Sequence, residues 1–196
     1  MSSFLEIFDQ HWAGRLQHRA RTMRKALELL EQLPQPQSIL ETGCMRELPT
    51  DEAAKNDGCS TMLWDAYACH HDGRVFSCDI DEAKVQQATD HVSERVAFLV
   101  GDSVRRLWNV PGPVQLLYLD SFDLQWTNPH PSALHHLAEM ASASRLLQPG
   151  SLVLIDDCGP DGGKGLYVAN WLHRIGATPI MRHYQYLWQM PSWKSI

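Results

Sequence analysis

The residues of this sequence that could bind a ligand or take part in catalysis are, first of all, acids that follow apolar runs. Five short apolar runs each end in an acid or are followed at once by one; these acids are Glu41, Asp79, Asp102, Asp120 and the pair Asp156-Asp157. A carboxylate at the end of a buried strand costs desolvation energy unless it binds something. One such acid would suit a helix N-cap, but the repetition over five runs indicates a shared binding site.

Glycine and hydroxyl residues accompany the first two acids. Gly43 follows the first run, and Gly58 and Ser60 open a predicted helix over 60–71. Glycines let a ligand approach the backbone, and a helix N-terminus offers free N–H groups. Asp79 lies 79 − 58 = 21 residues after Gly58, the place from which an acid after the second strand binds ribose hydroxyls. Neither Gly-x-Gly-x-x-Gly nor Gly-Lys-Ser/Thr is present, which disfavours a nicotinamide dinucleotide or a P-loop nucleotide.

Asp102 and Ser103 follow the third run. From this place Asp102 could meet the amino group of an adenine. The alternative is that the two residues only cap a short helix over 103–108.

The elements that must position these residues alternate between strand and helix. Near-continuous apolar strands separated by helices are typical of a parallel, doubly wound α/β sheet, in which ligands bind beyond the carboxyl ends of the strands. The predicted strands are 38–41, 74–79, 95–100, 114–120 and 151–156; the further helices are 81–91, 103–108, 131–147 and 164–175; and 177–190 is predicted to form an antiparallel strand pair.

The first 33 residues carry apolar side chains at three- and four-residue spacing. This predicts an amphipathic helix, or two helices broken near Gly14, ended by Pro34 and Pro36. We therefore divide the chain into a helical extension over 1–35 and a main domain over 36–196.

Composition narrows the class of protein. A hydrophobic share of 44% with 20% charged residues is an ordinary globular balance. The net charge of −6 argues against nucleic acid or an anionic membrane surface as a partner. No apolar run approaches the roughly 18 residues of a membrane span, and no signal peptide is recognisable. Five cysteines without a Cys-x-x-Cys pair indicate free thiols in a reducing, cytoplasmic setting.

Together these motifs resemble the class I S-adenosylmethionine (SAM)-dependent methyltransferases over residues 38–176. The resemblance implies a Rossmann-like, mostly parallel seven-stranded sheet. It also implies that a first loop with Gly43, Gly58 and Ser60, supported by Glu41, holds the methionine part of SAM. Residues further along would bind the remainder of the cofactor: Asp79 the ribose, and Asp102 with Ser103 the adenine end. One departure is the long connection over 44–58, where the family has a compact turn.

The second half of the chain resembles the metal-dependent O-methyltransferases of the macrocin and catechol types. That resemblance implies a magnesium ion bound by Asp120, Asp156 and Asp157. Three carboxylates at neighbouring strand ends would repel one another unless a cation neutralises them, and magnesium prefers such oxygen ligands. The alternative is that Asp120 contacts the ammonium group of SAM and that Asp156 and Asp157 cap a loop.

The general base is less defined. Catechol-type enzymes use a lysine soon after the first metal-binding acid, but 121–126 contains none. Asp123 is the nearest candidate, since macrocin-type relatives carry a second acid close by. His130 is the alternative on chemical grounds, but a structural role as a loop histidine near a helix start is favoured for it. His135 and His136 are expected to be structural, and the glycine-rich stretch 159–165 to form a mobile rim of the site.

The function predicted is SAM-dependent methyl transfer to a hydroxyl group of a small molecule, assisted by magnesium. Three alternatives remain open: a metal-independent methyltransferase with another acceptor, an inactive cofactor-binding or regulatory protein, and, more distantly, a nucleotide-sugar or dinucleotide enzyme on the same kind of sheet. The N-terminal helix and the aromatic C-terminal segment are candidate surfaces for a homodimer.

Overall fold

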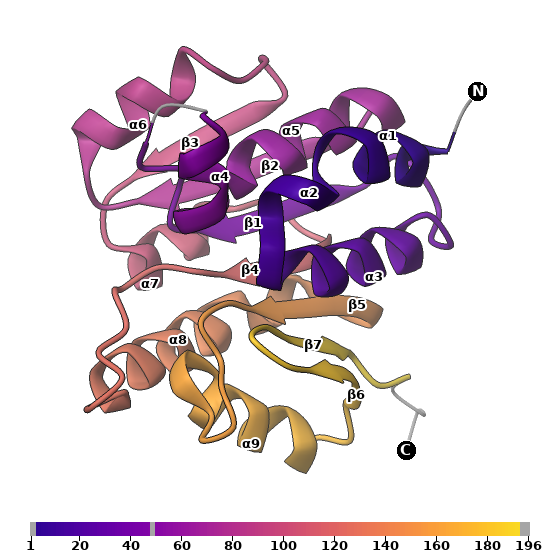
Figure 1. Cartoon of the computed structure of the whole chain (residues 1–196). Coiled ribbons are helices and arrows are strands. Elements are labelled where there is room, and N and C mark those ends of the chain that lie inside the picture. The colour runs from indigo at the N-terminus through magenta and orange to yellow at the C-terminus, as the bar shows by residue number, and fades with distance from the viewer. Residues whose placement is uncertain (1–2, 48–49, 193–196) are drawn as a thin grey trace.

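Seven strands form one sheet in the order β3-β2-β1-β4-β5-β7-β6 (Figure 1). The computed structural model describes residues 3–47 and 50–192. β1 to β5 pair in parallel, whereas β7 pairs antiparallel with both β5 and β6. This confirms the expected doubly wound, mostly parallel sheet with an antiparallel C-terminal pair. The strands are β1 Ser38–Thr42, β2 Arg74–Asp79, β3 Val96–Val100, β4 Val114–Leu119, β5 Leu147–Ile155, β6 Thr178–Arg182 and β7 Tyr186–Gln189.

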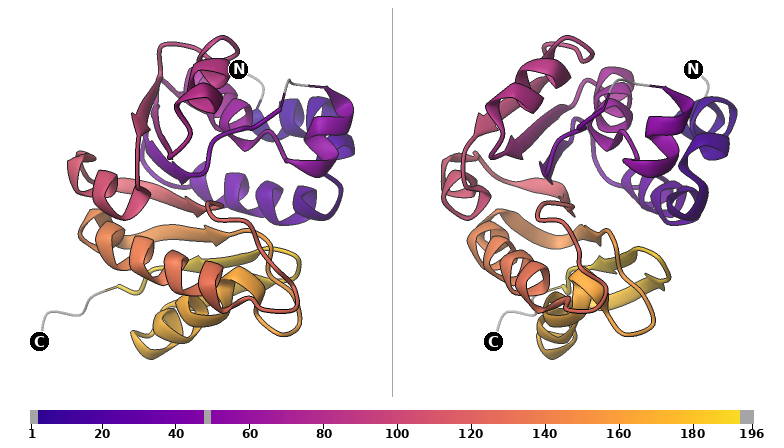
Figure 2. Two further views of the ribbon diagram at one scale, coloured as in Figure 1. Left: turned by 90° about the vertical axis from the view of Figure 1, so that its left-hand side faces the viewer. Right: turned by 60° about the vertical axis from the view of Figure 1, so that its left-hand side comes forward.

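The strands bury both of their faces because their side chains alternate between two cores. On β5, Leu152 and Leu154 belong to one apolar cluster, and Val153 and Ile155 to the other. The first cluster includes residues of α1, α3 and α5, and the second residues of α8 and α9. Helices consequently cover both sides of the sheet (Figure 2). A run of apolar residues without polar alternation is what such a doubly covered strand requires.

The helices follow the predicted segments closely. They are α1 Phe4–His11, α2 Ala13–Leu16, α3 Ala20–Leu30, α4 Asp51–Asn56, α5 Ser60–His71, α6 Glu82–Thr89, α7 Ser103–Arg106, α8 His130–Ala143 and α9 Leu166–Arg174. Only α4, inside the long polar connection 44–58, has no counterpart among the predicted elements.

The N-terminal segment is broken into three helices and packs onto the sheet. The interruptions lie at Trp12 and at the 3₁₀ turn Gln17–Arg19, not at Gly14, which is inside α2. Phe8 and Leu16 are fully buried in the cluster that includes Tyr118 of β4. The segment therefore shares its core with the sheet, and it carries Arg19 to the carboxyl end of β5.

No helix among residues 3–47 and 50–192 is long and apolar enough to cross a membrane.

Candidate active site

A cavity of about 390 Å³ opens beyond the carboxyl ends of the parallel strands. This volume suits a small-molecule ligand. Six of the residues that were expected to bind a cofactor lie on the wall of this cavity; they are Gly43, Ser60, Asp79, Asp102, Ser103 and Asp120. Two more of the expected residues, Glu41 and Gly58, lie outside the cavity wall.

Gly43 is where the backbone approaches the cavity most tightly. Its φ is +82°, and a Cβ atom there would lie 2.7 Å from the backbone oxygen of Asp120. Only glycine fits both the left-handed conformation and the contact with the end of β4. The turn after β1 therefore lies directly against the end of β4, and both segments form part of the cavity wall.

Asp79 is held rigidly at the end of β2. Its Oδ2 accepts a hydrogen bond from the backbone N–H of Cys44 at 3.0 Å, and its Oδ1 accepts one from the N–H of Asp81 at 2.8 Å. These bonds fix the carboxylate at the cavity wall. Each oxygen keeps a lone pair with which a ligand hydroxyl can bond.

Glu41 organises the loop around the cavity from beneath. This fully buried carboxylate accepts hydrogen bonds from the hydroxyls of Ser60, Thr61 and Ser77 at 2.5, 2.7 and 2.7 Å. Burial raises the pKa of Glu41 to about 7 even though the three hydroxyls oppose that shift. Glu41 thus ties β2 and the start of α5 to β1, and this geometry is that of a support for the loop.

Gly58 lies behind the cavity, against an arginine. A Cβ atom on Gly58 would lie 3.2 Å from Cδ of Arg19, and its φ is +86°. Gly58 therefore lets the connection 44–58 pass close to the N-terminal segment.

Asp102 caps α7 and also lines the cavity. Its Oδ1 accepts a hydrogen bond from the N–H of Val104 at 3.0 Å. The adjacent Ser103 is buried and donates its hydroxyl to Glu139. Asp102 therefore caps α7, as the alternative held, and it also lies on the cavity wall, where a ligand would meet it.

Glu139 of α8 is a site residue that sequence reasoning missed. It is fully buried and accepts hydrogen bonds from Ser103, from Ser121 at 2.6 Å and from Thr42 at 3.1 Å. It therefore ties together the ends of β1, β3 and β4. One feature of the sequence could have revealed Glu139: it is an acid on the apolar face of the predicted helix over 131–147, the face that carries Met140.

His135 gives Glu139 a partner at the cavity wall. Its Nε2 lies 3.3 Å from Oε1 of Glu139. The hydrogen bond that His135 donates to Glu139 raises the pKa of His135. Burial opposes the charge of Glu139, but His135 and the hydroxyl donors hold the pKa of this carboxyl below its usual value. His135 thus lines the cavity as well as packing in the helix.

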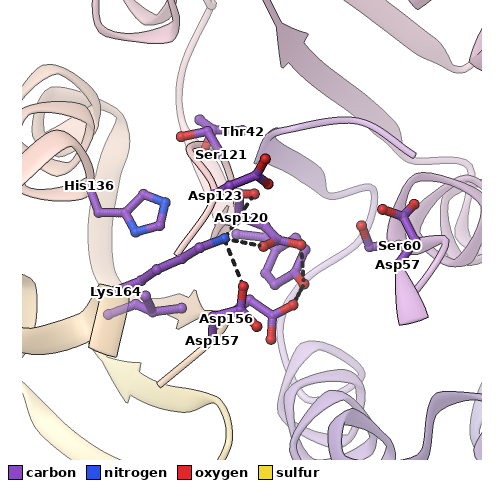
Figure 3. Close-up of polar contacts among 12 residues, drawn as sticks. Thr42, Asp57, Ser60, Asp120, Ser121, Asp123, His136, Asp156, Asp157 and Lys164 are labelled. Atoms are coloured by element: carbon purple, nitrogen blue, oxygen red, sulfur yellow. Dashed lines mark hydrogen bonds and ion pairs between the residues drawn. The ribbon is translucent and has the colours of Figure 1, made fainter. Parts of the chain in front are cut away.

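The three acids expected to bind magnesium come together around two cations of the chain itself, Lys164 and Arg19. Figure 3 shows Lys164 reaching toward the acids. Nζ of Lys164 lies 2.9 Å from Oδ1 of Asp120 and 3.0 Å from Oδ2 of Asp157. Nε of Arg19 lies 2.7 Å from Oδ2 of Asp156. Sequence reasoning missed both cations. Nothing local marks Arg19, 137 positions before Asp156, as its partner. Lys164 is near Asp157 in the sequence, but a lysine in a glycine-rich loop has no local mark that turns it toward the acids.

Two tyrosines complete this acidic cluster. The hydroxyl of Tyr118 lies 3.1 Å from Oδ2 of Asp120 and 3.0 Å from Oδ2 of Asp156. Tyr184 donates its hydroxyl to Oδ1 of Asp157. At least one oxygen of every carboxylate therefore bonds to a donor from the chain.

As arranged, the three carboxylates do not fit a magnesium ion. The Lys164 ammonium lies between Asp120 and Asp157, where a shared metal ion would have to bind. Burial opposes the charge of Lys164, but the carboxylates of Asp120, Asp157 and Asp156 together raise its pKa, so it stays a cation. Within 3–47 and 50–192, no three His, Cys, Asp or Glu side chains are grouped so that they could hold a metal ion.

The two candidate bases lie in different places. Asp123 lines the cavity, is 84% exposed, and pairs with Arg46 at 2.5 Å. His130 begins α8 on the surface, where its Nδ1 lies 2.8 Å from the hydroxyl of Tyr167. The structure does not bring His130 to the cavity wall.

The glycine-rich stretch after β5, expected to form a mobile rim of the site, is exposed at Pro160 and Asp161 but turns inward after them. Gly162, Gly163, Lys164 and Gly165 are all buried. A Cβ atom on Gly163 would lie 2.2 Å from the backbone oxygen of Asp157. The glycines thus let this segment fold against Asp157 and point Lys164 into the cluster.

A second, more open hollow of about 800 Å³ lies beside the acidic cluster. Its lining includes the aromatic side chains of Trp126, Tyr184 and Tyr186. It also includes the polar side chains of Arg182 and His183. The acidic cluster borders both the cavity and the hollow. Asp120 lines the cavity, and Tyr184, which bonds to Asp157, lines the hollow.

Comparison with known proteins bears on the fold. No protein-family model matches the sequence, and no curated protein matches it either. Among solved structures, the O-methyltransferase NovP is 18% identical, with a TM-score of 0.64 over 89% of this chain and 80% of that one. A putative O-methyltransferase from Klebsiella pneumoniae is 19% identical, with a TM-score of 0.55 over 91% and 88%.

MycE methyltransferase, solved in complex with Mg, SAH and mycinamycin VI, is 14% identical, with a TM-score of 0.64. All of this chain aligns, but it spans only 56% of the MycE chain. These similarities show that the chain has the class I methyltransferase fold, as the motifs implied.

Proposed function

We propose that this chain, which has the methyltransferase fold, transfers a methyl group from SAM to a hydroxyl group of a small molecule. The observation that carries the proposal is the cavity at the strand ends, with Gly43, Asp79, Asp102 and Asp120 on its wall. Five of the residues lining the cavity are aspartates, against one arginine and one lysine. Such a wall suits the positive sulfonium and ammonium groups of SAM and disfavours a phosphate-bearing cofactor.

The wall offers a distinct place for each part of SAM. Asp79 would accept bonds from the ribose hydroxyls, and the narrow turn at Gly43 would leave room for the methionine part. Ile80, which is 77% exposed, and Phe122, which is 51% exposed, would supply apolar surface for the adenine. When bound, SAM supplies an electrophilic methyl group. The chain's contribution is then to align an acceptor with it, which lowers the barrier of a direct displacement.

The acceptor would lie in the second hollow. The aromatic walls of Trp126, Tyr184 and Tyr186 would hold a flat or apolar molecule, with its hydroxyl directed toward the acidic cluster. Asp123, at the mouth of the cavity, is the carboxylate proposed to receive the hydroxyl proton.

Titration calorimetry with SAM, with its product S-adenosylhomocysteine (SAH) and with NAD tests the cofactor assignment. We expect binding of SAM and SAH only. Asp79→Asn should weaken binding about 10- to 100-fold, because hydrogen bonds to a charged group contribute roughly 1.5–3 kcal/mol. Asp90→Asn, at the exposed end of α6, is the matched control and should bind normally.

Absence of SAM and SAH binding by the folded wild-type protein would refute the proposal. Binding of both, with no methylated product from phenols, sugars or hydroxy acids, would instead indicate a cofactor-binding protein without turnover.

A further inference from the structure

We propose that Lys164, together with Arg19, supplies the positive charge for which a divalent metal ion is expected, so that this site needs no metal. The catalytic consequence rests on the proposed methyl transfer. The charge arrangement itself can be tested without any turnover. Lys164 is here a positioning residue, which holds Asp120 and Asp157 in place.

The ammonium of Lys164 is fully engaged by the cluster. Besides its contacts at 2.9 and 3.0 Å to Asp120 and Asp157, Nζ lies 3.4 Å from the backbone oxygen of Asp120. Its side chain is only 3% exposed. A magnesium ion bound by the same two carboxylates at roughly 2.0–2.1 Å from each oxygen would require Lys164 to leave.

The backbone around Lys164 is built to place this side chain. Gly162 and Gly163 have φ values of +100° and +48°, and Gly163 has no room for a Cβ atom against Asp157. The N–H of Lys164 donates to the backbone oxygen of Asp157 at 3.1 Å. The lysine and one of the acids that it neutralises are thus fixed to each other through the main chain as well.

Arg19 neutralises the third acid, Asp156. Its side chain is 8% exposed, and that of Asp156 is fully buried. The guanidinium also stacks on the ring of Tyr184, 5.0 Å from the ring centre. Because Arg19 comes from the N-terminal segment, the packing of that segment on the sheet delivers the second cation.

The charges of the cluster nearly balance without a metal ion. Three carboxylates against two cations leave at most one negative charge, because burial raises the pKa of Asp120 while Lys164 opposes that shift. This charge lies next to a cavity proposed to hold a sulfonium. A bound SAM sulfonium would neutralise that remaining charge. A divalent ion added to Lys164 and Arg19 would instead leave the cluster positive beside the sulfonium, which is unfavourable at short range.

Manganese titration of the SAM-free protein, followed by calorimetry and by electron paramagnetic resonance of Mn²⁺, tests the proposal. We expect no saturable binding to the wild type. Lys164→Met removes the charge at similar volume and should create a Mn²⁺ site, which the added change Asp157→Asn should abolish. Lys25→Met, on the surface of α3, is the matched control and should behave as the wild type.

Two outcomes would overturn the proposal: wild-type Mn²⁺ binding that Asp157→Asn abolishes, or a folded Lys164→Met variant that binds no Mn²⁺. If Lys164→Met does not fold, the wild-type titration decides by itself. Because no acceptor or SAM is present, failure here is distinguishable from failure of the methyl-transfer proposal, which the SAM calorimetry reports separately.

Discussion

At the scale of single residues, the two candidate bases make different predictions. Asp123 lines the cavity and His130 does not, so Asp123→Asn should lower kcat by about 100-fold or more, the usual contribution of a general base. His130→Gln should leave kcat unchanged. Steady-state kinetics with SAM and a hydroxylated acceptor that the wild type methylates measures both variants. A loss of kcat in His130→Gln, with kcat unchanged in Asp123→Asn, would instead assign the proton-accepting role to His130.

The pair of half-buried His135 and fully buried Glu139 predicts how stability depends on pH. The raised pKa of His135 means that its stabilising charge is complete below about 6.5 and is lost as the pH rises through the raised value. The lowered pKa of Glu139 means that its contribution is complete above about 4.5 and is lost as the pH falls through the lowered value. The pair is therefore intact between these limits.

We expect the wild-type melting temperature to fall as the pH rises from 6.5 toward 9, and to fall less in His135→Gln. His173→Gln, on the exposed side of α9, is the control and should keep the wild-type slope. Calorimetric melting over this pH range measures the difference. An unchanged slope in His135→Gln would show that the pair contributes nothing to it.

At the scale of elements, two glycines in helical or turn positions should respond oppositely to alanine. Gly163→Ala should destabilise the protein by about 1–3 kcal/mol or more, because φ is +48° and the Cβ atom would overlap the backbone of Asp157. Gly14→Ala, inside α2 with open space around it, should stabilise by roughly 0.5–1 kcal/mol. Urea unfolding measures both. A harmless Gly163→Ala would contradict the tight turn that positions Lys164.

The sequence predicted the helices and strands better than it predicted the roles of single residues. Continuous apolar runs, as at Leu152–Ile155, predict the strands, and the acids that follow them predict the edge at which a ligand binds. Lys164, Glu139 and Arg19 escaped prediction because their roles depend on which elements pack together. A lysine in a glycine-rich loop has the same local pattern whether it faces solvent or three buried carboxylates.

At the scale of the whole molecule, the N-terminal helices connect the fold to the site. They bury Phe8 and Leu16 in one of the two main cores and place Arg19 against Asp156. A surplus of acid that first argued against nucleic acid or an anionic membrane surface as a partner thus includes the aspartates of the cavity wall and of the cluster. There it is balanced partly by the chain's own cations and, in the proposed complex, by SAM.

A crystal structure of the protein with SAH, grown in the presence of magnesium, tests this account most directly. We predict SAH in the cavity against Gly43 and Asp79, with Lys164 between Asp120 and Asp157 and no metal ion bound there. An empty cavity, or a magnesium ion coordinated by the three aspartates with Lys164 turned away, would contradict it.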